Sequence, residues 1–201
     1  MLPEAHALNM AKRACGSRSL DVCSGIGAMS VALARSGQQV TAVEIDEGRV
    51  AMARHNAGIY DVADRIDFRH ADIISTATLQ SLPEDIDTLF LDPPWGDGPG
   101  DYLHRQVTYL EDLQLANVDL RVLVGNITCR EVMIRLPPNF DIGIFRQTRG
   151  EKIAYVTQTG YLHWYYIRMP KQEFVGIPAK GASHLSLEES REGFEAYFLR
   201  E

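Results

Sequence analysis

The fold is decided by residues 89–102, which read LFLDPPWGDGPGDY. An apolar run ends at Leu91, an acid follows at Asp92, and two prolines, a tryptophan and a glycine-rich loop come next. Such a run predicts a buried strand. Because open α/β sheets bind their ligands just beyond the carboxyl ends of their strands, we expect Asp92 to stand at the mouth of a binding site.

The two prolines make the turn after this strand stiff. Each fixes its own φ angle, lacks a backbone N–H, and pushes the preceding residue into an extended conformation. The carbonyls of Asp92 and Pro93 are therefore expected to point in defined directions, beside the Asp92 carboxylate and the indole of Trp95. Two acceptors and a flat aromatic ring suit a planar amine, because the acceptors take its N–H groups while the indole covers its ring.

Length and composition predict an ordinary globular protein. At 201 residues the chain is expected to form one domain, 1–201, with an N-terminal helix in residues 1–17 and a C-terminal extension, residues 170–201, that contains a helix. No apolar run is long enough to span a membrane, and the first residues lack an apolar signal core. We therefore expect an intracellular protein, cytoplasmic or nuclear and not secreted, without a membrane partner. The sequence leaves the oligomeric state open.

Cysteines and charges narrow the range of ligands. Cys15, Cys23 and Cys129 are odd in number and far apart, so they match neither a metal site nor a disulfide pattern, and we expect no metal. The net charge of −7 argues against a long nucleic-acid track. Residues 121–180, however, hold nine Lys/Arg and four Asp/Glu, a local excess that permits a short phosphate-bearing ligand.

Strand and helix patterns alternate along the first part of the chain, which predicts a parallel, doubly wound α/β sheet. The expected strands are residues 18–23, 39–43, 66–68, 88–91 and 121–127. The expected helices are residues 3–15, a segment that runs up to residue 34, and residues 47–58, 76–82 and 102–113. Asp46 is expected to cap the helix that begins at residue 47.

The pattern changes beyond residue 128. A helical turn is expected at residues 129–135, where two prolines stop it. Three segments rich in β-branched and aromatic side chains predict antiparallel pairing at one edge of the sheet, namely residues 142–147, 153–158 and 161–169. A capping box at residues 186–189 predicts a last helix that reaches residue 198.

A second motif lies at residues 21–27, which read DVCSGIG, a strand-end acid followed by a turn with two glycines. Gly25 and Gly27 would let a ligand approach the backbone closely and permit positive φ angles. A dinucleotide fingerprint needs a third glycine where Ser30 stands, and the charge of Asp21 would oppose a pyrophosphate. The same charge favours a cationic group.

Two further acids follow the next two expected strands. Glu44 ends the second strand, where a carboxylate can accept both hydroxyls of a ribose. Asp72 follows the third strand, where it can accept from an adenine amine. S-adenosyl-L-methionine carries a sulfonium, an ammonium, a ribose diol and an adenine. Each of these groups has a partner among the strand-end acids, so we expect this molecule as the cofactor.

Together these motifs resemble those of class I adenosylmethionine-dependent methyltransferases. Within that class the chain is most similar to the trimethylguanosine synthase family, which methylates guanine N2 in RNA caps. The likeness covers roughly residues 3–127, and its matched segments are residues 3–4, 53–57, 93–96 and 101–102. The family commonly has serine where Asp92 stands, and at that point the chain is closer to adenine-N6 methyltransferases.

The resemblance implies a Rossmann-like fold with a mostly parallel, seven-stranded sheet and an antiparallel C-terminal edge. It implies methyl transfer from S-adenosyl-L-methionine to the exocyclic N2 amine of 7-methylguanosine, with capped RNA or a 7-methylguanosine nucleotide as the partner. Asp92 and Pro93 are the implied catalytic residues, and Pro94 and Trp95 the implied substrate-binding residues. The implied cofactor-binding residues are Asp21, Gly25, Gly27, Glu44, Ile45, Asp72, Ile73 and Asp92.

Other hypotheses stay open beside this one. The methylated base can lie elsewhere, on rRNA, tRNA or DNA, and a methyltransferase fold can also bind cofactor or cap without turnover. Single residues have plainer interpretations as well. Asp92 can be a strand-end cap, Trp95 a core residue, Asp46 a helix cap only, and Cys23 a small apolar filler.

Overall fold

The structure is a computed structural model that describes residues 2–95, 109–113, 115–116, 118–156, 162–178 and 195–198. The chain divides into two compact units. Unit 1 comprises Met1–Asp92 and Ile127–Glu131, and unit 2 comprises Pro93–Asn126 and Val132–Glu201. The border therefore falls inside the Asp-Pro-Pro-Trp motif, and the expectation of a single domain stays a prediction.

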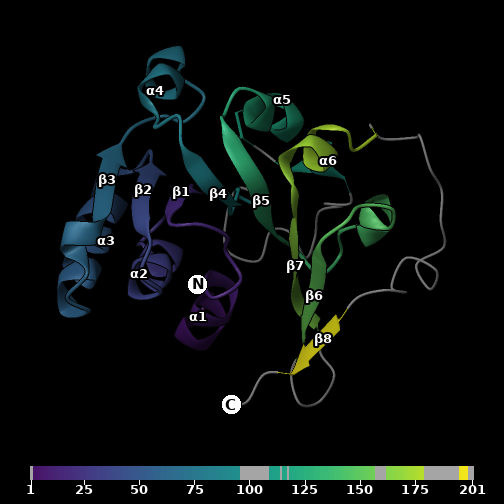
Figure 1. The fold of residues 1–201 in the computed structure, drawn as a ribbon, viewed down its shortest axis with the longest axis horizontal. Helices are drawn as coiled ribbons and strands as arrows, with labels where there is room; N and C mark the ends of the chain where they lie inside the picture. Colours follow the sequence, from purple (N-terminus) through teal and green to yellow (C-terminus); the bar gives the residue numbers. More distant parts are fainter. Residues whose placement is uncertain are drawn as a thin grey trace. The chain divides into compact units, whose positions relative to one another are not determined.

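Unit 1 is built on four parallel strands in the order β3-β2-β1-β4 (Figure 1). Their bounds are Arg18–Val22 for β1, Gln39–Glu44 for β2, Ile66–His70 for β3 and Ile86–Leu91 for β4. All six residues of β4 are buried, as its apolar run predicts. Because the four strands run in the same direction, their carboxyl ends share one edge of the sheet.

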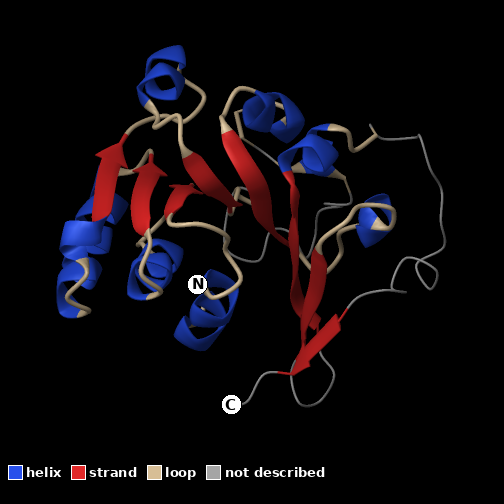
Figure 2. Cartoon of the chain, viewed as in Figure 1, coloured by secondary structure: helices blue, strands red, loops and turns tan. Residues whose placement is uncertain are grey.

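Helices alternate with these strands, as Figure 2 shows. They are α1 (Glu4–Ala11), α2 (Ala28–Arg35), α3 (Glu47–Ile59) and α4 (Thr76–Ser81), with a short 3-10 helix, η1 (Ala63–Arg65), before β3. The side chain of Asp46 accepts from the backbone N–H of Arg49 at 2.9 Å, so it caps α3 as expected. The alternating order predicted for this part of the chain is confirmed.

The connection from α1 to β1 is fastened to β4. The carboxylate of Asp87 accepts from the backbone N–H groups of Ser17 at 2.8 Å and Arg18 at 3.2 Å. The hydrogen bond from Ser17 is the main reason that the pKa of Asp87 lies below its usual value. Gly16 has a φ of +65°, and a Cβ there would lie 2.0 Å from Cγ of Asp87, so the position admits only glycine.

Glu131 also holds the connection between α1 and β1 in place through hydrogen bonds. Its Oε1 accepts from the backbone N–H of Cys15 at 2.9 Å and lies 2.8 Å from the hydroxyl of Thr88 in β4. Thr88 is fully buried. Glu131 belongs to the first residues of β5 (Cys129–Leu136), which are part of unit 1. A partly buried hydrogen-bond network thus joins β4, the start of β5 and the α1–β1 connection.

Unit 2 contains the rest of β5 and three further strands. β6 (Glu151–Val156) pairs antiparallel with β7 (Leu162–Pro170), as expected, and parallel with β8 (Glu195–Phe198). The helical segments are η3 (Leu110–Asp112), α5 (Leu120–Gly125), η4 (Ile142–Phe145) and α6 (Lys171–Val175). The described residues form eight strands, whereas the family resemblance implies a sheet of seven.

One prediction for unit 2 is wrong because helix and strand are exchanged. The sequence predicts a strand at residues 121–127 and a helical turn at 129–135, whereas the structure has helix α5 followed by strand β5. Asp119 begins α5, since its side chain accepts from the N–H of Arg121 at 2.8 Å. The capping side chain selects the helix, although the apolar, β-branched composition of the segment is typical of a strand.

Two further expectations fail in this unit. Residues 142–147 are predicted as a strand, but η4 forms there because Asp141 accepts from the N–H of Gly143 at 2.9 Å. The end of the expected last helix forms β8 instead, where it pairs with β6. The remainder of that helix, and most of the helix expected at residues 102–113, lie outside the described residues. Helix α6, at the start of the C-terminal extension, is not the helix that the sequence predicts there.

Candidate functional site

Acidic side chains collect at the carboxyl edge of the unit 1 sheet. Asp21 lies in β1, Glu44 ends β2, and Asp72 and Asp92 follow β3 and β4. The backbone N–H of Asp92 donates to the carbonyl of Val22 at 3.4 Å, which ties the end of β4 to the end of β1. The structure therefore brings the four predicted strand-end acids to one edge of the sheet.

Asp21 is the most enclosed of these acids, with 1% of its surface exposed. The hydroxyl of Ser30, in the first turn of α2, donates to Oδ2 of Asp21 at 2.5 Å. Oδ1 is buried and has no hydrogen-bond partner in the described part of the chain. Burial raises the pKa of Asp21 to about 7, and the charges of Asp92 and Glu44 contribute to the rise.

The glycine turn between β1 and α2 is shaped by its neighbours. The N–H of Gly25 donates to Oε2 of Glu44 at 2.8 Å, so the turn is bonded to the end of β2. Gly25 has a φ of +55°, and a Cβ there would meet nothing within 4 Å. Gly27 has a φ of +82°, and a Cβ there would lie 2.9 Å from Cβ of Ala53 in α3. Gly25 therefore faces open space, whereas Gly27 lets α3 pack closely.

Two polar side chains that support this turn were not singled out from the sequence. The Asn56 amide in α3 donates to the carbonyl of Ile26 at 2.9 Å and holds the turn from the helix side. Ser30 stands where a dinucleotide fingerprint has glycine, and the structure shows it as the donor to Asp21. Both contacts arise from tertiary packing of a helix against the turn. The one sequence signal is that Ser30 is polar at a position where the helix is otherwise buried.

Cys23 lies at the centre of the acidic edge. Its φ is +60°, unusual for a residue with a side chain, because the chain turns sharply there. Burial raises the pKa of the Cys23 thiol, and the charges of Asp92, Glu44, Asp21 and Asp72 raise it further. The thiol therefore stays protonated and is no nucleophile, which agrees with its interpretation as a filler. The same interactions show that the four acids lie close enough to act on one group.

The remaining candidates for cofactor binding differ in exposure. Ile45 is 65% exposed directly after Glu44, so it offers an apolar surface at the acidic edge. The backbone carbonyl of Ile45 lies 3.1 Å from Nε2 of His70. Asp72 is exposed, and its Oδ1 accepts from the N–H of Ile74 at 3.1 Å. Ile73 is buried, which leaves its main chain rather than its side chain for a ligand.

The candidate substrate residues belong to unit 2. Pro93 is buried, Pro94 is exposed, and Trp95 is partly exposed. The guanidinium carbon of Arg135 in β5 lies 4.6 Å from the centroid of the Trp95 ring and 5.4 Å from that of Trp164 in β7. Trp95 is therefore not a fully buried core residue. Its partner Arg135 was missed, since no local pattern links positions so distant in sequence. The glycine loop after Trp95 and the Asp-Tyr pair at 101–102 lie outside the described residues.

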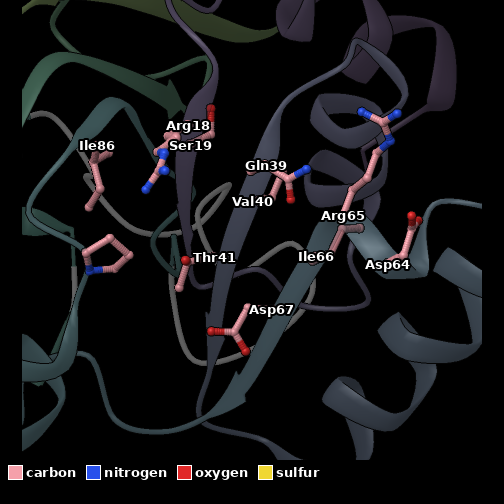
Figure 3. Close-up of a pocket in the computed structure, with 11 residues that line it drawn as sticks. Arg18, Ser19, Gln39, Val40, Thr41, Asp64, Arg65, Ile66, Asp67 and Ile86 are labelled. Atoms are coloured by element: carbon pink, nitrogen blue, oxygen red, sulfur yellow. The ribbon is translucent and has the colours of Figure 1, made fainter.

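A separate cavity of about 390 Å³ lies in unit 1 (Figure 3). It is lined by residues at the amino ends of the four strands, among them Arg18, Thr41, Asp67 and Ile86. Because strand-end acids collect at the opposite ends, this cavity is distinct from the candidate site. Within the described residues there is no group of three or more His, Cys, Asp or Glu side chains placed to hold a metal ion. The described helices include none that is long and apolar enough to cross a membrane.

The acidic edge fits a cationic ligand. A carboxylate as deeply buried as Asp21 ionises at a cost unless a positive group compensates it, and its Oδ1 lacks a partner among the described residues. Glu44 retains acceptor capacity beyond its bonds to Gly25 and to the N–H of Asp46, because each carboxylate oxygen accepts more than one hydrogen bond. An ammonium or sulfonium with an adjacent diol matches this set of acceptors.

Comparison with known sequences shows which protein family the chain resembles. A family model described as RNA cap guanine-N2 methyltransferase matches residues 16–171, more than half of the chain. The trimethylguanosine synthase of Schizosaccharomyces pombe is 32% identical over 125 residues, which are 61% of this chain and 51% of that protein. The 23S rRNA (uracil(1939)-C(5))-methyltransferase RlmD of Shewanella amazonensis is 36% identical over 89 residues, 44% of this chain and 20% of that enzyme. The chain thus spans about half the length of the fission-yeast relative.

Solved structures share the fold. A protein of Porphyromonas gingivalis W83 assigned as a methyltransferase has a TM-score of 0.61 at 17% identity, over 84% of this chain and 40% of that one. A protein of Pyrococcus horikoshii assigned as an RNA methyltransferase has a TM-score of 0.53 at 14% identity, over 83% and 80%. The expected Rossmann-like methyltransferase fold is confirmed. By its sequence match and its fold, the chain belongs to the RNA cap guanine-N2 methyltransferase family, whose cofactor is S-adenosylmethionine.

Proposed function

We propose that this chain methylates the exocyclic N2 amine of 7-methylguanosine, in a capped RNA or a cap nucleotide. The observation that carries the proposal is the buried, half-satisfied carboxylate of Asp21 among three further strand-end acids. A cationic nucleoside is the ligand that such an edge accommodates best. The family match and the Pro-Pro-Trp motif support guanine as the base.

The protein's own residues have separate tasks in this proposal. S-adenosylmethionine supplies a methyl group that its sulfonium has already activated. Asp21 would balance the positive charge of the bound cofactor, and Glu44 would accept from its ribose. The exposed side chain of Ile45 would support the adenine. Gly25 leaves room for close approach, because nothing lies within 4 Å of a Cβ at that position.

Asp92 and Pro93 would act on the substrate amine. An exocyclic guanine nitrogen is a weak nucleophile, since its lone pair is delocalised into the ring. Hydrogen bonds from its N–H groups to the Asp92 carboxylate and the Pro93 carbonyl would orient that lone pair and stabilise the positive charge that develops on nitrogen. The N–H proton can then leave to water. Trp95 would stack on the base, and a 7-methyl cation adds about 0.5–2 kcal/mol of cation–π attraction.

A direct assay tests the proposal. The chain is incubated with methyl-labelled S-adenosylmethionine and either 7-methylguanosine triphosphate or a 7-methylguanosine-capped RNA. We expect label in the nucleotide, loss of that label in Asp92→Ala and Trp95→Ala, and retention in Asp46→Asn, whose carboxylate only caps α3. Tight cofactor binding without transfer to any guanine nucleotide would instead identify a module that binds without turnover.

Methylation of another RNA base is a second candidate, because RlmD, named as a 23S rRNA uracil methyltransferase, matches part of the chain at 36% identity. Parallel reactions with an uncapped rRNA fragment and with adenine-containing oligonucleotides separate the two functions. Label that appears in uncapped RNA, and not in the cap nucleotide, would favour this second function over cap methylation.

A further inference from the structure

The carboxylate of Asp21 is hydrogen-bonded through one oxygen and unsatisfied at the other. The hydroxyl of Ser30 donates to Oδ2 at 2.5 Å, and Ser30 is fully buried. Oδ1 is also buried and has no partner among the residues that the structure describes. The neighbours of Asp21 in register, Ala42 on β2 and Phe90 on β4, are apolar. Ser30 is therefore the polar side chain that holds this carboxylate within unit 1.

The start of α2 explains why Ser30 reaches Asp21. The residue before the helix is Gly27, which has no side chain to cap it. Ser30 is the third residue of α2, so its backbone N–H has no carbonyl partner within the helix. Burial raises the pKa of Asp21, whereas the hydroxyl and the backbone N–H of Ser30 both lower it. Ser30 thus stabilises the ionised carboxylate through its side chain and its main chain.

The charged groups around Asp21 oppose its ionisation. Asp92, after β4, and Glu44, at the end of β2, are both acidic and raise the pKa of Asp21 further. The thiol of Cys23, in the turn between β1 and α2, is neutral because its own pKa is raised by burial. The first turn of α2 contains no charged residue. A hydrogen bond to an ionised acceptor is stronger than one to a neutral acceptor, so the Ser30 hydroxyl favours the carboxylate over the acid.

We propose that Ser30 is a positioning residue of the cofactor site, whose hydroxyl keeps Asp21 ionised as the counter-charge for a cationic cofactor. Ser30 acts through Asp21 in this role and needs no contact with the cofactor. A glycine at this position, as in a dinucleotide fingerprint, would leave the buried carboxylate without the hydroxyl donor. The inference rests on the proposed role of Asp21 as the counter-charge and does not depend on which base is methylated.

Calorimetric titration with S-adenosylmethionine, at pH values between 6 and 9 and without a nucleotide, tests the proposal. Ser30→Ala removes the donor, and Ser30→Thr keeps a hydroxyl. Without the hydrogen bond Asp21 should ionise about one pH unit higher. The affinity of Ser30→Ala relative to wild type should therefore be about fivefold lower at pH 7 and within about twofold at pH 9. A structural defect alone would lower the relative affinity by the same factor at both pH values, and Ser30→Thr should follow the wild-type profile.

Unfolding of the ligand-free protein gives a second measurement. Ionisation of Asp21 at a higher pH extends the range over which the free energy of unfolding falls, so the fall in Ser30→Ala should continue to about pH 8. Ser36→Ala is the matched control, because the Ser36 hydroxyl donates to the carbonyl of Leu33 at the other end of α2. It should leave both pH profiles unchanged. Adding Ser30→Ala to Asp21→Asn should also leave them unchanged, since the titrating group is gone.

The outcomes separate the possible failures. If wild-type affinity depends on pH and Ser30→Ala loses the same factor at pH 7 and pH 9, the inference is overturned and the role of Asp21 stands. If wild-type affinity does not depend on pH, the counter-charge role of Asp21 fails and the inference fails with it. Transfer of label to a cap nucleotide is measured independently of these profiles, so a failure of cap methylation is distinguishable from both.

Discussion

Ser30 and Asp21 share one hydrogen bond, in which the Ser30 hydroxyl donates to Oδ2 while Oδ1 of the same carboxylate is buried without a partner in the described chain. The pair connects the first turn of α2 to the end of β1. Burial raises the pKa of Asp21 to about 7, because the hydrogen bond from Ser30 offsets only part of the cost of removing the charged carboxylate from water. The ligand-free protein therefore keeps a titrating group at its acidic edge near neutral pH.

Cofactor binding is expected to weaken as the pH falls below 7. A cationic ligand favours ionised Asp21, and protonation below a pKa of about 7 removes that charge, so the affinity is expected to fall about tenfold per pH unit. The Cys23 thiol, whose pKa is raised, stays neutral throughout this range. Calorimetry with S-adenosylhomocysteine at pH 6 and pH 8 measures the effect. Asp21→Asn is the control and should bind weakly at both values; equal wild-type affinities would contradict the assignment.

The same group makes ligand-free stability depend on pH in the opposite sense. An unfolded Asp titrates near 3.9, so between about pH 4 and pH 7 the folded state holds a proton that the unfolded state has released. The free energy of unfolding therefore falls as pH rises through this window and is level above it. Asp21→Asn should remove a fall of about 4 kcal/mol, at 1.36 kcal/mol per pKa unit. Urea unfolding of both proteins at pH 4.5 and pH 8 tests this, and parallel profiles would refute it.

The strand-end acids could be predicted from sequence because each lies at or just beyond the end of an expected strand, and a parallel sheet places such positions at one edge. The side chains that support them could not. Ser30 and Asn56 reach the glycine turn from two helices, and Arg135 reaches Trp95 from a strand 40 positions later. These contacts depend on how the helices and strands pack against one another, and the periodicity of the sequence does not predict that packing.

Changing Gly25 or Gly27 to alanine is expected to affect different properties: cofactor affinity for Gly25 and folding stability for Gly27. Both have positive φ angles, so each substitution carries a backbone strain of roughly 1 kcal/mol. Only Gly27→Ala also forces a Cβ to 2.9 Å from Ala53, so it should lose about 1–3 kcal/mol more in thermal or urea unfolding. Gly25→Ala should stay folded and lose cofactor affinity, because its new methyl occupies the open side. Equal stability losses in the two variants would show that the turn packs differently.

Thr88 tests the network that joins β4 to the start of β5. Its buried hydroxyl lies 2.8 Å from Oε1 of Glu131, so Thr88→Val should lower the free energy of unfolding by about 1–2 kcal/mol. Thr128→Val makes the same change at an exposed position nearby and should stay within about 0.5 kcal/mol of wild type. Urea unfolding monitored by circular dichroism gives both values. A neutral Thr88→Val would mean that Glu131 does not contact β4 as described.

The exchange of helix and strand at residues 120–136 shows that a short apolar segment does not by itself distinguish a helix from a strand. In α5 the apolar residues Leu120, Leu123 and Val124 are buried, while Val122 is 59% exposed, which is the spacing of a helix. Over six residues the same apolar content is equally typical of a buried strand. Asp119 decides between the two, because a capping carboxylate stabilises a helix start and adds nothing to a parallel strand.

Asp119→Ala is therefore expected to be costly, and Asp85→Ala provides the matched comparison. Asp119 accepts from the N–H of Arg121 at 2.8 Å and from its guanidinium Nε at 2.9 Å, so its loss should cost about 1–2 kcal/mol. Asp85 also pairs with an arginine, Arg18 at 2.6 Å, but both side chains are more than half exposed, and its loss should cost less than about 0.5 kcal/mol. The hydrogen bond from Arg121 lowers the pKa of Asp119, so the Asp119 contribution should be present above about pH 4 and lost below it. Denaturant unfolding of both variants at pH 7 and pH 3 measures this, and a variant pair that is indistinguishable at pH 7 would contradict the capping role.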